Sequence, residues 1–429
     1  MKTTFYALAA CLGLGTFSVQ AQDLRMASSD NGNSALKGKQ CATMDVLQAQ
    51  LAADPALAQR MSTIENQTRQ FEASPAAHRI GATVVIPVVV HVVYNTAAQN
   101  ISDAQVQSQI DVLNEDFRNL NADRTKVPAA FAGLAADANV QFVLAKRTPT
   151  GAATNGIDRV QTRTSSWSSN DAVKNAKRGG ANAWDATNYL NLWACNLGQG
   201  LLGYAQFPGG SASTDGVVIL YSAFGSKAKA PGVYSSPYDL GRTATHEVGH
   251  WLNLRHIWGD ASCGNDLVSD TPTQQTSNYG CPAYPHVTCS NQGDMSMNYM
   301  DYVDDACMYM FSTGQSTRMN ALFAAGGARA GLLTSLGGTA PRATLASLGS
   351  ASEVAMYPNP ASNVLNLTLP QNIGASVWNV TVYDLRGYEM KQASYNGQGQ
   401  VNVSQLPQGL YQMTISNGEK TVRQQFQKN

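Results

Sequence analysis

Residues 246–256 read HEVGHWLNLRH, and this stretch is the strongest indication of fold and chemistry in the sequence. Residues four apart share one face of a helix, so His246 and His250 can place two imidazoles on one metal ion. His256 follows six residues later and can supply a third nitrogen after the helix ends. Three neutral imidazoles leave the fourth tetrahedral position of a zinc ion open to water, which is the catalytic arrangement. Glu247 lies beside these ligands and can act as the general base towards that water.

Length and charge limit the other possibilities. The chain has 429 residues and a formal net charge of zero, with 29 basic and 29 acidic side chains. This length suggests two or three domains. No basic stripe stands out, so nucleic acid is not an expected partner. We also expect a monomer. After the N-terminal stretch, no segment is long and apolar enough to be a transmembrane segment.

The N-terminus has the pattern of an export signal. Lys2 supplies a positive charge, residues 5–19 are mostly apolar, and small residues end the stretch at Ala21. We therefore predict a signal peptide at 1–21 and export. An alternative is a lipoprotein site at Cys11, although the apolar run before that cysteine is short for one.

The remaining chain divides into regions of different composition. Residues 22–79 are polar, with helical spacing from Met44 to Met61, and are expected to be a pro-segment. Residues 80–337 alternate strands and helices, which predicts an α/β (α+β) catalytic domain. The expected elements are strands at 83–94, 139–147, 189–195 and 216–221, a helix capped by Ser102, and a helix at 241–253. Residues 258–316 show little regular pattern, as is typical of a long functional or crosslinked loop region.

The C-terminal part has its own pattern. Residues 338–351 are rich in Gly, Ala and Ser and are predicted to be a linker. Residues 352–429 alternate apolar and polar side chains between turns such as Asn396-Gly397. This pattern predicts a small all-β sandwich.

The cysteines fall into two groups. Four lie in one stretch, at positions 263, 281, 289 and 307, and export makes disulfides permissible among them. Four cysteines allow three pairings, and the spacing does not choose among them. Cys41 and Cys195 stand apart.

The chain resembles the pappalysin family of metzincin metallopeptidases over about residues 80–337. The resemblance is carried by residues 246–260, by Asp270-Thr271-Pro272, and by Asn298-Tyr299-Met300-Asp301-Tyr302. Asn253 stands where the metzincin motif has glycine. A sharp turn with positive φ is needed there, and asparagine tolerates it best after glycine.

The resemblance implies further structure and further roles. It implies an upper part with a twisted sheet and the zinc helix, and an irregular lower part. Met300, rather than Met297, would be the Met-turn residue under the imidazoles, and Tyr302 would stabilise the oxyanion. The stretch Gly203-Tyr204-Ala205 would be the edge strand that pairs with substrate.

Crosslinks, a second metal and a cleavage preference are implied in the same way. The resemblance pairs Cys263 with Cys289 and Cys281 with Cys307. It also implies structural calcium, for which Asp266, Asp270 and Thr271 offer hard oxygen ligands. A basic residue just after the cut bond is a family preference, which carboxylates at 301, 304 and 305 would suit; these carboxylates are equally compatible with solvated loop positions or calcium ligands.

The tail resembles the sorting domain of bacterial type IX secretion cargo. The matching residues are 357–361, 382–387 and 406–411. The alternative is a carbohydrate-binding or adhesive β module. The resemblance implies the type IX secretion machinery as a partner and a location outside the cell or on its surface, reached through the periplasm.

We therefore predict a secreted zinc endopeptidase that acts on proteins or peptides. One alternative is a zinc hydrolase of non-peptide amides, and another is an adhesin with an inactive peptidase-like domain. Because a binding-only zinc site needs no base, the presence of Glu247 argues against the adhesin.

The segment before the catalytic domain is expected to keep the precursor inactive. A thiolate binds zinc strongly, so Cys41 is predicted to occupy the open zinc position in the precursor, as the resemblance also suggests. The alternatives are that Asp45 supplies this ligand, or that Cys41 forms a disulfide with Cys195. Activation would need a cut near His78-Arg79.

Overall fold

The computed structural model describes residues 41–74, 81–341, 354–369, 378–417 and 421–429. It divides into two compact units, Met1–Ala340 and Pro341–Asn429, which are described separately. The predicted signal peptide, most of the predicted linker and the predicted cut at His78-Arg79 lie outside the described residues. Among the residues described, no helix has the length and apolar character needed to cross a membrane.

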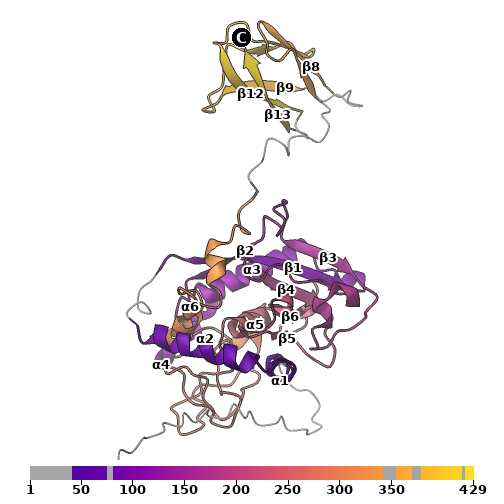
Figure 1. Ribbon diagram of the computed structural model, residues 1–429. Coiled ribbons are helices and arrows are strands. Elements are labelled where there is room, and N and C mark those ends of the chain that lie inside the picture. Colours follow the sequence, from indigo (N-terminus) through magenta and orange to yellow (C-terminus); the bar gives the residue numbers. More distant parts are fainter. Residues whose placement is uncertain (1–40, 75–80, 342–353, 370–377, 418–420) are drawn as a thin grey trace, which may run out of the picture. The chain divides into compact units, whose positions relative to one another are not determined.

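The first unit is built on one twisted sheet (Figure 1). Its strands are β1 Val84–Tyr94, β2 Val140–Leu144, β3 Ile157–Gln161, β4 Leu190–Cys195, β5 Gly203–Ala205 and β6 Val217–Leu220. The order is β2-β1-β4-β6-β5, with β3 also pairing with β1. Every pair is parallel except β5 with β6, which is antiparallel and makes β5 an edge strand.

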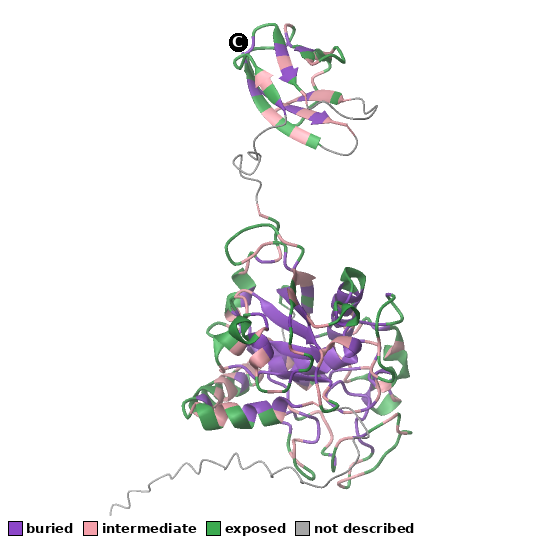
Figure 2. Ribbon diagram, turned by 90° about the vertical axis from the view of Figure 1, so that its right-hand side faces the viewer, coloured by how far each residue is buried: buried purple, intermediate pink, exposed green. Residues whose placement is uncertain are grey.

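The strand predicted at 83–94 is confirmed as β1, which has neighbours on both sides. Its side chains are buried except at Val85 and partly at Tyr94, as a continuous β-branched run in a covered parallel sheet requires. Figure 2 shows the strands of this sheet as a buried layer at the centre of the unit. The α/β fold class predicted from the sequence is therefore correct.

Helices α3 Asp103–Phe117 and α5 Arg242–Trp251 pack against this sheet. Two shorter helices, α4 Ala129–Ala132 and α6 Thr313–Ala321, contribute Phe131 and Met319 to the same apolar core. The predicted cap of α3 is present, because Ser102 Oγ accepts a hydrogen bond from Gln105 N at 3.1 Å. Short 3-10 turns lie at Ala97–Gln99, Ala122–Lys126, Ala172–Lys174, Ala176–Arg178, Ala212–Thr214, Tyr221–Ala223, Asp305–Cys307 and Ala330–Thr334.

The segment before β1 forms two helices, not the single one that its spacing predicted. They are α1 Thr43–Ala53 and α2 Leu57–Glu72, and the chain breaks between them at Asp54-Pro55. Proline lacks an N–H and disfavours helix in the residue before it, which explains the break. Helix α1 packs beside the edge strand β5, and α2 packs beside α6.

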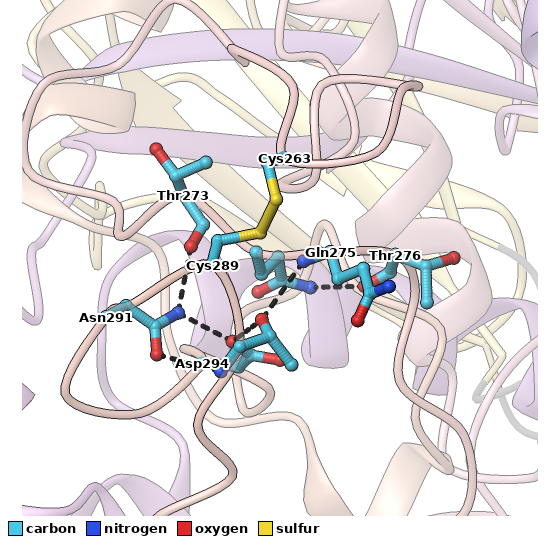
Figure 3. Close-up of a disulfide and its surroundings, with 9 residues drawn as sticks. Cys263, Thr273, Gln275, Thr276, Cys289, Asn291 and Asp294 are labelled. Atoms are coloured by element: carbon cyan, nitrogen blue, oxygen red, sulfur yellow. Dashed lines mark hydrogen bonds between the residues drawn. A yellow bond between two sulfur atoms is a disulfide. The ribbon is translucent and has the colours of Figure 1, made fainter.

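The stretch after α5 is irregular, as expected, and crosslinked. Disulfides join Cys263 to Cys289 and Cys281 to Cys307, the pairs that the family resemblance implies. Around the first bridge, side-chain hydrogen bonds hold the loop. Asn291 Nδ2 donates to Thr273 O at 2.8 Å and to Asp294 Oδ1 at 2.7 Å (Figure 3). These contacts hold a loop that has no helix or sheet of its own.

The second unit consists of two antiparallel sheets around one apolar core. One sheet has the order β10-β11-β8-β7 and the other β13-β12-β9. The strands are β7 Ala355–Tyr357, β8 Val364–Thr368, β9 Asn379–Asp384, β10 Ser394–Tyr395, β11 Gln400–Asn402, β12 Gly409–Ser416 and β13 Thr421–Lys428. Alternate side chains such as Tyr411, Met413 and Ile415 are buried, so the predicted all-β sandwich is confirmed.

Candidate active site

Helix α5 carries His246, Glu247 and His250, and all ten of its residues are buried. Its N-terminus is held by Asp305, whose Oδ2 accepts hydrogen bonds from the N–H groups of Leu240 and Arg242. A carboxylate at this end satisfies free N–H groups and favours the helix dipole.

The helix ends where the sequence placed the sharp turn. Asn253 has φ 71°, so the positive φ expected for this residue is confirmed. The turn sends the chain back, and Leu254 N donates to Gly249 O at 3.0 Å. His256 is thereby returned to the two histidines of the helix.

The three histidines converge through their Nε2 atoms. His250 Nε2 lies 3.2 Å from His246 Nε2 and 3.1 Å from His256 Nε2. Their Nδ1 atoms face protein acceptors. The acceptors are Tyr299 O at 2.7 Å for His246, Leu254 O at 2.8 Å for His250, and Asp260 Oδ1 for His256.

These partners show which kind of group the centre fits. A carbonyl oxygen only accepts, so Nδ1 of His246 and of His250 carries the ring proton and Nε2 carries a lone pair. Lone pairs that face one another at about 3 Å repel unless a cation lies among them. Three neutral imidazoles that converge in this way, each fixed by an outer acceptor, suit a zinc ion.

Cys41 completes the cluster. Its Sγ and the ligand atoms of the three histidines all lie within 4.8 Å of one another. Burial and the nearby Glu247 carboxylate raise the pKa of the Cys41 thiol well above its ordinary value. The thiol is therefore protonated without a cation, and a metal ion bound by the three histidines would favour its thiolate form.

The other two candidates for latency are placed differently. Asp45 is exposed on α1. Cys195 is a free thiol, as is Cys41, and is buried in an apolar cluster with Trp193. The structure thus contains no Cys41–Cys195 disulfide.

Glu247 is pressed between the helix and the edge strand. A Cβ built at Gly203 would lie 2.9 Å from Glu247 Cγ and 3.1 Å from its Oε1, so only glycine leaves this carboxylate its space. Glu247 Oε2 accepts a hydrogen bond from Thr43 Oγ1 at 2.8 Å and from Cys41 Sγ at 3.3 Å. The segment before β1 therefore reaches the carboxylate directly.

This segment also covers the edge strand. Cys41 pairs in parallel with Gly203, and Ala42 N donates to Gly203 O at 3.1 Å. Thr43 Oγ1 accepts a hydrogen bond from Ala205 N at 2.8 Å. Tyr204, between these two residues, is buried beneath the strand. The three edge-strand residues singled out in the sequence thus lie against the segment that precedes the catalytic domain.

Met300 and Tyr302 lie on either side of the buried Asp301, next to the histidines. Met300 is fully buried, and its Sδ would lie 2.5 Å from a Cβ built at Gly249, so the sulfur packs against the helix itself. Tyr302 Oη lies 3.1 Å from His256 Nε2. Burial raises the pKa of the Tyr302 hydroxyl well above its ordinary value, so it stays protonated.

Two of the three acidic side chains after Met300 serve the fold. Asp301 is buried and accepts hydrogen bonds from Gln274, Asn278 and Tyr302 N, and Asp305 caps α5. Asp304 is partly exposed. Burial, and to a smaller extent the charge of Asp304, raises the pKa of Tyr238 to about 12. Of the three, Asp304 is the one whose carboxylate is available to a ligand.

The residues proposed for calcium are only partly assembled. Thr271 Oγ1 donates to Asp266 Oδ2 at 2.9 Å, and burial raises the pKa of Asp266 to about 7. The Asp270 carboxylate instead accepts hydrogen bonds from Ser312 Oγ and Gly314 N at the start of α6. Within the described residues, Cys41 and the three histidines are the cluster of His, Cys, Asp and Glu side chains that suits a metal ion.

Two residues of the site had no role in the sequence analysis. Asp260, which accepts from His256 Nδ1, lies four residues after that histidine, and this spacing could have indicated it. Thr43 lies two residues after Cys41, but its contact with Glu247 spans 204 residues and leaves no local signal.

Comparisons with known proteins agree with this geometry. Residues 174–324 match the family described as pregnancy-associated plasma protein-A, and residues 355–429 match the secretion system C-terminal sorting domain. The chain is 36% identical over 308 residues to an extracellular metalloprotease of Colletotrichum graminicola, covering 65% of this chain and 96% of the relative. It is 32% identical over 334 residues to one of Pyricularia oryzae, covering 76% and 96%.

Solved structures show the same likeness. Promirolysin of Tannerella forsythia, in a mutant form, is 50% identical with a TM-score of 0.63 and covers 69% of this chain and 97% of that one. Mature mirolysin of the same organism, in complex with a cleaved peptide, is 53% identical with a TM-score of 0.59, covering 61% and 100%.

Proposed function

The chain belongs to the pappalysin family of secreted zinc metalloendopeptidases, and we propose that His246, His250 and His256 hold its catalytic zinc, with Glu247 as the general base. The observation that carries this proposal is the convergence of the three Nε2 atoms and Cys41 Sγ, which lies 3.3 Å from the Glu247 carboxylate. The relatives reported above are named extracellular metalloproteases, which favours a peptidase over the two alternatives, a hydrolase of non-peptide amides and an inactive adhesin.

Zinc held there would act as a Lewis acid that polarises the peptide carbonyl and makes a water a better nucleophile. Glu247 takes the proton from the attacking water and returns it to the amine nitrogen of the leaving peptide. Gly203 supports this role, because the absent side chain leaves the carboxylate room against the edge strand. Asp260 fixes the His256 ring by accepting a hydrogen bond from its Nδ1.

Tyr302 is the candidate for oxyanion stabilisation. Its hydroxyl lies at the metal ligands and remains a neutral donor because burial raises its pKa. A donor fixed where negative charge develops lowers the barrier of acyl transfer. Met300 contributes by packing against α5 at Gly249, which keeps the histidines in place.

We further propose that residues 22–79 keep the precursor latent. Cys41 is placed to bind the metal, Thr43 holds the base, and Ala42 and Thr43 occupy the backbone of the edge strand. A substrate peptide needs all three of these places. The exposure of Asp45 favours Cys41 over Asp45 as the blocking ligand.

Specificity and domain boundaries complete the proposal. Asp304, beside Tyr238, would favour a basic residue just after the cut bond. The sorting domain implies a secretion machinery as partner and export from the cell. We propose that residues 1–21 are a signal peptide, 80–337 the catalytic domain and 338–351 a linker, and that calcium near Asp266 is a structural ion.

Casein digestion by the activated enzyme tests the proposed function. We expect cleavage that a zinc chelator abolishes and that added zinc restores. Digestion that continues in the presence of chelator, with no metal bound, would contradict the zinc mechanism. No digestion of casein or gelatin by a zinc-loaded protein would favour a non-peptide substrate.

A further inference from the structure

Helix α2 is fastened to the catalytic domain by an ion pair between Glu65 and Arg318. Glu65 accepts hydrogen bonds from both ends of the guanidinium, Nη1 at 3.0 Å and Nη2. A second carboxylate, Glu72 Oε1, lies 3.9 Å from Nη1. The Arg318 side chain is only 1% exposed, so this is a buried, bidentate carboxylate site.

Arg318 is held in place from the catalytic side. Its Nε donates to Asn253 O at 3.0 Å, and Asn253 is the turn residue between the second and third histidines. The guanidinium is therefore fixed by the metal-site turn, independently of α2. Among the described residues, its two ion-pair partners, Glu65 and Glu72, both belong to α2.

The pair lies in a cavity that borders the catalytic centre. The cavity has a volume of about 180 Å³ and lies between the two helices and a strip of the catalytic domain. We call this the cationic strip, and it consists of Phe207, Asn253, Arg255 and Arg318. At one end, the Phe207 ring packs on the His250 ring with centroids 5.5 Å apart. The strip thus begins at a candidate zinc ligand.

Release of the pro-segment changes the charge of the strip. Arg255 and Arg318 stay with the catalytic domain, whereas Glu65 and Glu72 leave with α2. Arg318 then loses both direct partners, and an unpaired guanidinium in a recessed site strongly favours a new carboxylate.

We propose that Arg318, supported by Arg255, forms a subsite that binds an acidic side chain of the peptide substrate in the activated enzyme. Glu65 occupies this subsite in the precursor. In the same way, Thr43 occupies the space beside Glu247 that substrate would take. The inference rests on the proposed function, because it assigns a side-chain preference to that endopeptidase.

The binding mode of the pro-segment supports a substrate as the occupant. Its main chain pairs with the edge strand, its apolar residues Leu47 and Leu57 cluster with Phe207, and its Glu65 reaches Arg318. A peptide lying along the same strip meets the same three features in turn. The planar fork of arginine matches a carboxylate and discriminates against an uncharged amide.

The test compares paired fluorogenic peptides with the activated enzyme made from the full-length precursor. Each pair differs only by Glu or Gln at one position on either side of the cut bond, and all C-termini are amidated so that only the side-chain carboxylate is compared. At one or two positions, we expect Glu to raise kcat/KM about tenfold over Gln, mainly through KM. The advantage should shrink as salt is added.

Substitutions within the cationic strip test whether its arginines cause the preference for Glu over Gln. The Glu/Gln ratio should fall to about one in Arg318→Gln, fall partly in Arg255→Gln, and be partly kept in Arg318→Lys. Arg163→Gln, which removes an exposed cation outside the strip, is the matched control and should keep the full ratio. Arg318→Gln also removes the hydrogen bond from Nε to Asn253 O and could fail to fold for that reason. In that case, the Glu/Gln ratio of Arg255→Gln tests the subsite, and a full ratio in that variant would overturn it.

The test distinguishes a failure of the subsite from a failure of the proposed endopeptidase function. Equal cleavage of Glu and Gln peptides at every position would overturn this inference alone, as would a Glu preference that both Arg255→Gln and Arg318→Gln retain in full. An enzyme that cleaves none of the peptides would overturn the proposed endopeptidase function and this inference with it.

Discussion

Thr43 Oγ1 lies 2.8 Å from Glu247 Oε2, and the same hydroxyl accepts a hydrogen bond from Ala205 N at 2.8 Å. One pro-segment side chain thus holds the candidate base and an edge-strand donor together. Cys41, two residues earlier, lies with the three histidines. Latency in this arrangement has two separable parts, a ligand for the metal and a partner for the base.

The first prediction separates these parts. In the full-length precursor, Cys41→Ala should process itself faster than wild type or show basal activity, because the metal position is no longer blocked. Thr43→Val is nearly isosteric and removes the hydrogen bond to the Glu247 carboxylate, about 1.5–3 kcal/mol, together with the one from Ala205 N. It leaves Cys41 at the metal position, so it should weaken latency less than Cys41→Ala. Self-cleavage followed over time by gel measures both effects.

Asp45→Ala is the control for the alternative ligand. Asp45 is exposed on α1, so its loss should leave the precursor as silent as wild type. A silent Cys41→Ala precursor together with an active Asp45→Ala precursor would show that a carboxylate, and not a thiolate, blocks the metal.

The second prediction concerns the crosslinks. Peptide mapping without reduction should find Cys263 with Cys289 and Cys281 with Cys307. Each bridge joins residues 26 apart, which corresponds to about 3 kcal/mol of unfolding free energy in the chain-entropy model. The Cys281→Ser, Cys307→Ser double variant should lose about this amount in denaturant unfolding. A Cys263–Cys281 peptide would refute the pairing.

The third prediction uses the pH dependence of Asp266. Its folded pKa is about 7 against an ordinary value of 3.8, so the folded state binds more protons than the unfolded state between these values. The stability contributed by this protonation is therefore complete below about pH 4 and is lost as the pH rises through 7.

Calcium would bind only the ionised carboxylate, so it should raise Tm at pH 8 much more than at pH 5. Asp266→Asn should remove both the pH slope and the calcium effect in thermal unfolding. A calcium effect that survives in Asp266→Asn would place the ion elsewhere.

The fourth prediction concerns export. Residues Met1–Ala340 form a compact unit without the tail, so deletion of residues 352–429 should leave a folded peptidase. Without the sorting domain, this protein should accumulate in the periplasm instead of reaching the surface or medium. Fractionation with a casein overlay measures location and activity together. Normal release of the truncated chain would mean that the tail is not the sorting signal.

The parts that sequence could predict are local. The residues of β1 form one continuous β-branched run, and the three histidines lie within eleven residues, so short patterns were sufficient. The positive φ of Asn253 was predictable for the same reason, because the motif fixes where the chain must turn.

The parts that sequence could not predict depend on contacts between distant segments. Thr43 meets Glu247 across 204 residues, and Glu65 meets Arg318 across 253, and neither pair has a spacing that a pattern could detect. Strand β3 was also missed, because its five residues are only partly buried and show no clear alternation. The break between α1 and α2 is different, because Pro55 is a local signal in the sequence that predicts it.

The role of Glu247 as the base is tested by the activity of Glu247→Ala in the activated enzyme, measured together with its zinc content. The variant should bind one zinc through the three histidines and keep the fold, since Glu247 is not a ligand. Its kcat/KM on casein-derived peptides should fall by roughly 10³-fold or more, because the proton carrier is gone. A zinc-loaded variant that stays within a few-fold of wild type would contradict the assignment of Glu247 as the base.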